Sequence, residues 1–325
     1  MPFPLQSLPD PALKHILRCM TPLELLAISV LSTKYSGLVK SLKIRADDLK
    51  IILEENVTFD VTFQNGRLFV SFPNAVLNDL DQKPGVTKIS YLCRCHVWMN
   101  LGVKLRTYLE CISRNFEWKD GIQIYFWTEH EVLNMEALSK CFVSVTSTVI
   151  DPPCSVEYAR KILKYFGPVT KCIKHYNELF RDKSSLIQSF LISNYDEFLF
   201  TYASNTTLEN LLSFNAESIY IFRSDFTLND VHQFIKLWMK GCNPRLKILY
   251  IPLSAENEIY DQNIVLKGIQ YQEVGEDVER QFMWQRRWRE VIKGGYNITS
   301  RNGRRATVHM NQMGIECRIL FLVWD

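Results

Sequence analysis

Cys93, Cys95 and His96 are the residues of this chain whose types and spacing most suggest a metal site. A structural zinc ion needs four ligands at tetrahedral angles, and paired cysteines usually have two to four residues between them. Here a single residue, Arg94, separates the two cysteines, and no second pair follows at a suitable distance. The sequence therefore predicts no metal and no cofactor.

Catalytic motifs are also missing from the sequence. It contains no Gly-x-Ser-x-Gly nucleophile turn and no glycine-rich phosphate loop. The six histidines are dispersed and follow no paired carboxylate pattern. Cys141 and Cys242 remain conceivable nucleophiles, but either would need a base that only the fold can place beside it. Core or surface roles are favoured for both, and we predict a non-catalytic protein.

Two basic patches occur near the C-terminus, at residues 286–289 and 301–305. Arginines alternating with Trp284 and Trp288 could stack on nucleic acid bases. A formal net charge of only +3 disfavours that use, and we expect a solvated helix face with its tryptophans in the core. A third possibility is recognition of an acidic or phosphorylated partner, because the arginine fork matches such groups.

Length and composition indicate a globular intracellular protein. The 325 residues suggest one small module and one larger domain, with 47% hydrophobic and 22% charged residues. The sequence shows no apolar run of about 18 residues and no secretory signal, so we expect no membrane span. Nine scattered cysteines fit reduced thiols, which places the protein in the cytoplasm or the nucleus.

The N-terminal 42 residues predict three short helices. Asp10 and Pro11 suit the start of the first helix, and Thr21, Pro22 and Glu24 form a capping box for the second. Ser32 is expected to cap the third. The second helix is apolar on nearly every side, so it should be buried all round. Three short helices rarely form an independent core, and the surplus apolar surface needs cover from the same chain or from another protein.

These residues resemble an F-box. The order Leu8-Pro9, Leu13, Ile16-Leu17, Met20, then residues 23–26, 28–29 and 31–32 is complete, although Leu31-Ser32 and Tyr35 depart from the commonest residues. The resemblance implies that the helices bind a Skp-type adaptor and, through it, a cullin ubiquitin ligase. The adaptor-binding residues implied are Leu8, Pro9, Leu13, Ile16, Leu17, Met20, Leu23, Glu24, Leu26, Ile28 and Leu31. Alternatively, the helices simply cap an α/β domain of the same chain.

After a polar join at residues 43–48, strands and helices alternate. We predict a hairpin over 57–72 with a turn at Asn65-Gly66, and strands over 122–127, 169–175, 186–193, 218–222 and 246–251. Helices are predicted over 103–116, 156–166, 208–212 and 227–240. The 29 residues from Ile219 to Ile248 match a strand–helix repeat, which suggests an irregular relative of the leucine-rich repeat.

A second resemblance covers residues 234–250. Phe234, Trp238 and the sequence Gly241-Cys-Asn-Pro-Arg245 are similar to the type 2 F-box-associated domain, which follows the F-box in a family expanded in nematodes. Residues 296–310 and 315–324 fit the end of that family, as a strand, an Asn-Gly turn and two further strands. Such a β-meander would close one edge of the sheet.

We therefore predict a mixed α/β protein, with a three-helix F-box at 1–46 and, at 47–325, a leucine-rich-repeat-like recognition domain ending in a β-meander. The resemblance implies a substrate-recognition subunit of a Skp–cullin–F-box ubiquitin ligase that bridges an unknown target protein to the adaptor. The alternative is a stand-alone α/β scaffold that binds RNA, although the small charge disfavours nucleic acid. Candidate target-binding residues are Arg286, Arg287, Arg301, Arg304 and Arg305.

Overall fold

A computed structural model describes the chain except residues 1–6, 74–78, 92–93, 100, 129–133, 143, 177–187, 189, 202–205, 255–260, 286–287, 314–315 and 325. It divides into two compact units, residues 1–155 and residues 156–325. The boundary predicted between residues 46 and 47 falls inside a strand of the first unit, and independent folding of 47–325 stays a prediction.

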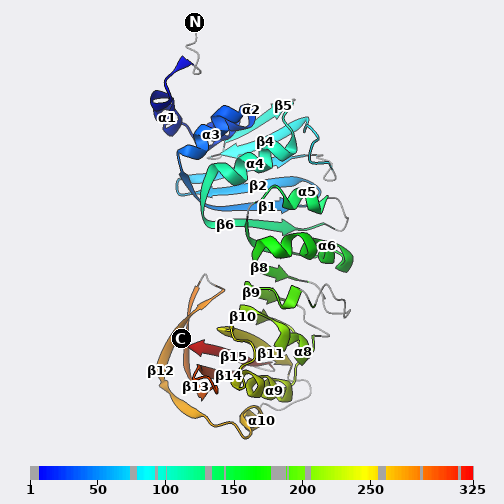
Figure 1. The fold of residues 1–325 in the computed structure, drawn as a ribbon, viewed down its shortest axis with the longest axis vertical. Coiled ribbons are helices and arrows are strands. Elements are labelled where there is room, and N and C mark those ends of the chain that lie inside the picture. The colour runs from blue at the N-terminus through cyan, green and yellow to red at the C-terminus, as the bar shows by residue number, and fades with distance from the viewer. Residues whose placement is uncertain are drawn as a thin grey trace. The chain divides into compact units, whose positions relative to one another are not determined.

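The first unit begins with three helices and continues as a sheet (Figure 1). Its elements are α1 (Asp10–Arg18), α2 (Pro22–Leu31), α3 (Thr33–Ser41), β1 (Ile44–Leu53), β2 (Val57–Phe63), β3 (Gly66–Phe72), β4 (Val86–Tyr91), β5 (Arg94–Met99), α4 (Leu105–Asn115), β6 (Phe116–Phe126), α5 (Met135–Ser139) and β7 (Val145–Ile150). Strand order is β7-β6-β1-β2-β3-β4-β5. β7, β6 and β1 are parallel, and β1 to β5 form an antiparallel meander.

One face of this sheet packs against α4. Alternate residues of β2 and β3, including Phe59 and Phe72, are fully buried. The Phe72 ring lies 5.4 Å from that of Phe59 and 4.8 Å from that of Tyr108 on α4, in edge-to-face geometry. The buried side chains that alternate along the two strands thus pack against the apolar face of α4, as expected from the predicted hairpin and helix.

The second unit alternates helices and strands before it ends in a meander. Its elements are α6 (Val156–Phe166), the 3-10 turn η2 (Gly167–Val169), β8 (Thr170–His175), β9 (Tyr195–Phe200), α8 (Leu208–Ser213), β10 (Ala216–Ile221), α9 (Leu228–Met239), β11 (Ile248–Ser254), α10 (Gln262–Leu266), β12 (Gln272–Trp284), β13 (Trp288–Thr299), β14 (Arg305–Met313) and β15 (Glu316–Trp324). Strand order is β12-β13-β14-β15-β11-β10-β9-β8. β8 to β11 are parallel, and β15 joins the meander antiparallel to β11.

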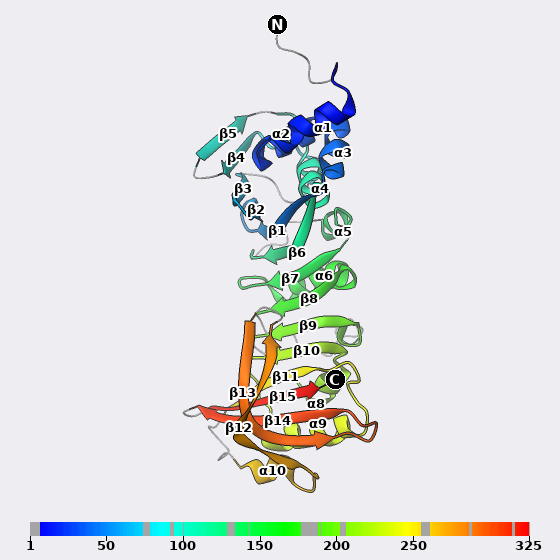
Figure 2. The same ribbon diagram turned by 90° about the vertical axis from the view of Figure 1, so that its left-hand side faces the viewer.

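The two faces of the second sheet have different cover. Phe321 on β15 faces α9, where its ring lies 4.9 Å from that of Trp238. The adjacent Leu322 belongs to an opposite core with Tyr220 and Ile292, onto which Phe282 and Trp284 of β12 pack. The long β12–β13 hairpin therefore covers the face opposite the helices (Figure 2).

Most predicted elements of the second unit are confirmed, but the leucine-rich-repeat character is not. Trp238 is buried, with 1% of its surface exposed. Its aromatic partner is Phe321, whereas Ile248 lies in the core on the opposite face of the sheet. The sequence could not show that β15 is inserted beside β11, because that pairing joins segments far apart in the chain.

Four local predictions were wrong. Residues 43–48 are not a polar join, because β1 begins at Ile44 and carries its acidic residues half-buried. The described part of residues 186–193 is not a strand: Gln188, Phe190 and Leu191 are helical, and the strand begins at Tyr195. The expected helix face around Trp288 is instead the β12–β13 hairpin, and Trp288 is 54% exposed. Finally, Asp10 does not cap α1, since Pro9 occupies the cap position without a side-chain bond.

Candidate partner-binding surfaces

The three N-terminal helices enclose a small core of their own. It consists of Leu13, Leu17, Leu25, Val39 and Leu42, with Leu8, Met20, Ile28 and Tyr35 packed around it. The predicted caps fix where α2 and α3 begin. The Thr21 hydroxyl accepts a bond from the Glu24 N–H, the Thr21 N–H donates to the Glu24 carboxylate at 2.7 Å, and Ser32 caps α3.

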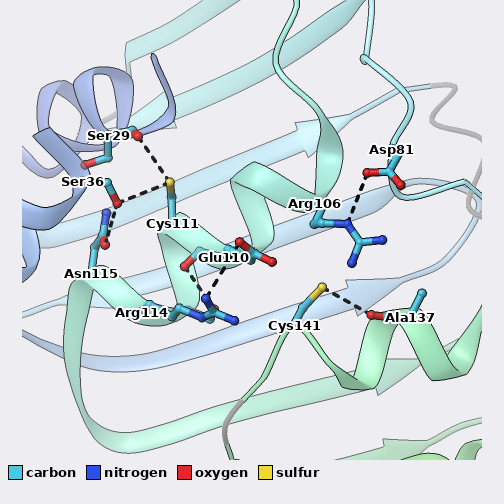
Figure 3. A network of polar contacts seen from close by, with 11 residues as sticks. Ser29, Ser36, Asp81, Arg106, Glu110, Cys111, Arg114, Asn115, Ala137 and Cys141 are labelled. Atoms are coloured by element: carbon cyan, nitrogen blue, oxygen red, sulfur yellow. Dashed lines mark hydrogen bonds and ion pairs between the residues drawn. The ribbon is translucent and has the colours of Figure 1, made fainter. Parts of the chain in front are cut away.

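Polar contacts attach these helices to α4 (Figure 3). The Cys111 thiol donates to the Ser29 carbonyl oxygen of α2 at 3.4 Å. From α3, the Ser36 hydroxyl donates to the Asn115 side-chain oxygen at 3.1 Å and lies 3.8 Å from the Cys111 sulfur. Burial raises the pKa of the Cys111 thiol, which keeps it a neutral donor. The helices are therefore held at a defined angle to the sheet that α4 covers.

In the second unit, a cavity of about 690 Å³ opens beside the β12–β13 hairpin. Its lining combines polar, aromatic and aliphatic side chains: Met239, Gln270, Tyr271, Gln272, Arg280, Gln281, Asn297, Ile298, Thr299, Arg305 and Trp324. Arg280 donates to the Asn297 side-chain oxygen at 2.8 Å and to the Thr307 hydroxyl. The Trp324 ring centroid lies 5.4 Å from the same guanidinium carbon. The cavity thus holds an oriented cation over an aromatic ring.

Asn243 explains the Gly-x-Asn-Pro sequence that follows α9. Gly241 ends the helix with a φ of +111°, a value that favours glycine. Asn243 is buried, and its amide donates to the carbonyl oxygens of Leu211 and Phe214 at 3.2 and 2.8 Å. This side chain therefore ties the α9–β11 turn to the end of α8.

Comparison with known protein families agrees with both ends of this architecture. The F-box domain model matches residues 5–47, and the F-box associated model matches residues 186–251. This chain contains an F-box and an F-box associated domain. It is also 22% identical, over 282 residues, to the F-box associated domain-containing protein sdz-33 of Caenorhabditis elegans, covering 83% of this chain and 86% of that protein. No solved structure matches the chain.

Within the F-box, the predicted adaptor-binding residues differ in exposure. Leu13, Leu17 and Leu26 are buried inside the chain, and Leu8, Ile16, Met20, Leu23 and Ile28 are partly buried. Pro9, Glu24 and Leu31 are exposed, with 61% of Leu31 accessible. The Glu24 carboxylate accepts hydrogen bonds from the backbone and the side chain of Thr21, and these bonds lower the pKa of Glu24. Among the described residues of the F-box, Leu31 is thus the most exposed large apolar side chain.

The three predicted target-binding arginines that the structure describes have different environments. Arg286 and Arg287 lie outside the described residues. Arg304 has a role within the fold, since it donates to the Leu246 carbonyl oxygen at 2.7 Å and lies over the Trp238 ring. Arg301 is exposed in the β13–β14 turn, and Arg305 lines the 690 Å³ cavity. Arg280 was not among the predicted residues, because it lies outside both basic patches of the sequence.

The described residues contain no group of three or more His, Cys, Asp or Glu side chains that could hold a metal ion. Cys95 and His96 lie on the exposed strand β5, and Cys93 is outside the described part. Cys141 is buried, its thiol donates to the Ala137 carbonyl oxygen, and burial raises its pKa, which disfavours the nucleophilic thiolate. Among the described helices, none is long and apolar enough to span a membrane. F-box and F-box associated domains are typical of non-catalytic receptor proteins.

Proposed function

We propose that this chain is the substrate-recognition subunit of a Skp–cullin–F-box ubiquitin ligase. The observation that carries the proposal is the F-box at residues 5–47, whose helices leave apolar side chains open at the surface. The receptor itself makes and breaks no bonds. Its contribution is proximity, because holding a target near a ubiquitin-loaded enzyme raises the effective concentration of the reacting groups.

The open face of α2 is the proposed centre of the adaptor contact. Leu25, Leu26, Ser29 and Val30 are the buried residues of that helix. Leu23, Ala27 and Leu31 follow one another at intervals of four residues, so they share a different face, and all three retain exposed surface. Pro9, exposed at the start of α1, and the partly buried Leu8 and Ile16 extend the proposed surface. An apolar face of this kind suits a partner with an apolar groove.

Co-purification with a Skp-type adaptor tests the proposal. The double variant Leu23→Asp and Leu31→Asp places two carboxylates on the open face of α2. We expect adaptor recovery to fall roughly tenfold or more, since an unpaired charge is costly in an apolar contact. The matched control is Val97→Asp, a similarly exposed apolar residue on β5 of the same unit, which should leave recovery unchanged.

Circular dichroism must show that the double variant stays folded. Wild-type recovery of adaptor by a folded double variant would remove this face from the proposal. Failure of the wild-type chain to recover adaptor at all would reject the ligase function.

Target recognition is proposed to use residues beyond the F-box. The N-terminal helices are occupied on one side by α4 and, in this proposal, on another by the adaptor. The 690 Å³ cavity of the second unit, in contrast, has solvent-exposed side chains in its lining, among them Arg305 and Tyr271. A captured target should bind the full chain and should not bind residues 1–46 fused to a carrier protein.

A further inference from the structure

We propose that the cavity around Arg280 and Arg305, together with its neighbour across Trp324, binds an extended protein segment that carries an anionic group beside an apolar side chain. The inference rests on the proposed receptor function, since the occupant would be a target segment. The anionic group is a phosphate or a carboxylate, which share the same recognition chemistry.

Hydrogen bonds fix the orientation of Arg280. Its Nη1 donates to Asn297 and Thr307, and the Trp324 indole N–H donates to the same Thr307 hydroxyl at 2.8 Å. Thr307 in turn donates to Asn297 at 2.8 Å. Four consecutive strands, β12 to β15, therefore each contribute one side chain to the network. A guanidinium carries five N–H donors, and those on Nε and Nη2 make no hydrogen bond with the described residues.

The charged side chains that line the first cavity are all positive. Arg280 and Arg305 are the charged residues in the described lining, which contains no carboxylate. The remaining polar groups are amides and hydroxyls from Gln270, Gln272, Gln281, Asn297, Thr299 and Tyr271. Arg305 is exposed and forms no ion pair with the described residues. Two guanidinium groups that form no ion pair with the described residues, one of them fixed in direction, favour an anion, because charge-assisted hydrogen bonds are the strongest that such a site can form.

A second cavity, of about 320 Å³, lies next to the first. It shares Gln281 and Trp324 with the first cavity, so the two are adjacent. Most of its lining is apolar: Ile248, Phe282, Met283, Leu322, Val323 and Trp324. Its two charged residues, Glu217 and Lys247, pair with each other at 3.3 Å. A small apolar side chain matches this cavity, next to the anion in the first.

A protein segment fits this pair of cavities better than a nucleic acid does. A nucleic acid strand presents a phosphate at every step and binds through a row of cations. The first cavity offers two, and the formal net charge of the chain is only +3. The apolar second cavity has no counterpart on a sugar–phosphate backbone.

The test uses full-length protein and fluorescein-labelled decapeptide libraries that are degenerate except at two positions. One fixed position holds phosphoserine, glutamate or serine, and the other holds a nearby leucine or alanine. Anisotropy titrations measure binding, with a ten-nucleotide RNA as a further probe. The protein variants are Arg305→Gln and the control Arg289→Gln, an exposed arginine of the neighbouring strand β13 that lines neither cavity.

We expect the phosphoserine library or the glutamate library, each with leucine at the second fixed position, to bind at least about tenfold more tightly than the serine library. In Arg305→Gln most of that difference in affinity should be lost. Binding of phosphoserine alone identifies phosphate as the group, and binding of both identifies a general anion site. Equal binding of the three libraries, wild-type affinity in Arg305→Gln, or tighter Arg305-dependent binding of RNA would overturn the proposal.

Adaptor recovery separates this inference from the ligase proposal. Arg305→Gln should recover the adaptor as well as the wild type does, whereas the Leu23→Asp and Leu31→Asp variant should still bind the peptide libraries. If adaptor recovery fails and peptide discrimination persists, the ligase function is rejected and the anion site stands. If discrimination fails and adaptor recovery persists, the anion site alone is rejected.

Discussion

The Cys111 sulfur on α4 lies 3.4 Å from the Ser29 carbonyl oxygen on α2, and this contact joins the F-box to the sheet that follows it. Ser29 is buried, so the two helices meet without intervening solvent. The F-box helices therefore share a core boundary with α4 in addition to their own small core. A receptor that positions a target gains from such an attachment, because proximity acts only when the bound partners are held in a defined geometry.

Alkylation of Cys111 should report this attachment. At about pH 7.5, iodoacetamide should modify the exposed Cys19 and Cys95 quickly and Cys111 slowly, because Cys111 is buried and its pKa is raised by burial. Ser29→Leu overpacks the α2–α4 contact and should accelerate the modification of Cys111. Peptide mass spectrometry gives the rate at each cysteine.

Cys317 provides the control for this measurement, because burial raises its pKa to about 11 and it lies in the second unit. Cys317 should react slowly, and at the same rate in the wild type and in Ser29→Leu. Equally fast labelling of Cys111 and Cys19 in the wild type would show that α2 does not cover α4 in solution.

Trp238→Ala should be among the most destabilising single changes in the second unit. The side chain is 1% exposed and packs edge-to-face on Phe321, so its removal leaves a cavity between α9 and the sheet. We expect a loss of about 3–5 kcal/mol in the free energy of unfolding, measured with urea. Trp288→Ala removes a tryptophan that is 54% exposed and should cost less than about 1 kcal/mol. Equal losses in the two variants would contradict this packing.

Sequence analysis predicted best what is local in the chain. The capping box at Thr21 and the helix predicted over residues 227–240 depend on residues three or four apart, and the structure confirms both. The short apolar run over residues 186–193 could not be assigned, because periodicity does not separate a buried strand from a buried helix of that length. Only part of the proposed anion-binding site could be predicted: Arg305 stands in a basic patch of the sequence, whereas Arg280 and Trp324 come close to it only through strand pairing.

The Asp60–Arg67 ion pair on β2 and β3 should depend strongly on its arginine. Asp60 accepts two hydrogen bonds from the Arg67 guanidinium, and 3% of its side chain is exposed against 64% for Arg67. Arg67→Ala leaves a buried carboxylate without its cation. We expect a loss of about 1–3 kcal/mol, below the value for a fully buried pair because water can reach the vacated position.

A double variant shows whether the buried charge causes that loss. Asp60→Ser combined with Arg67→Ala removes both partners and should recover part of the stability lost in Arg67→Ala alone. Urea midpoints of the single and double variants give the comparison. If the double variant loses more free energy of unfolding than the two single variants lose together, the pair is not coupled in this way.

His309 on β14 should make stability fall in mild acid. Burial lowers its pKa below the ordinary value of 6.5, and a hydrogen bond with the Lys293 backbone opposes that shift only in part. The folded state therefore favours the neutral ring, whereas the unfolded chain takes up a proton once the pH falls below about 6.5. The contribution of His309 to stability is complete above that pH and decreases as the pH falls toward the lower, folded-state pKa.

The urea concentration at the unfolding midpoint, measured between about pH 7 and pH 5.5, should decline in the wild type and decline less in His309→Gln. Identical slopes for the two proteins, or a wild type that gains stability over this range, would show that His309 is not held neutral by the fold.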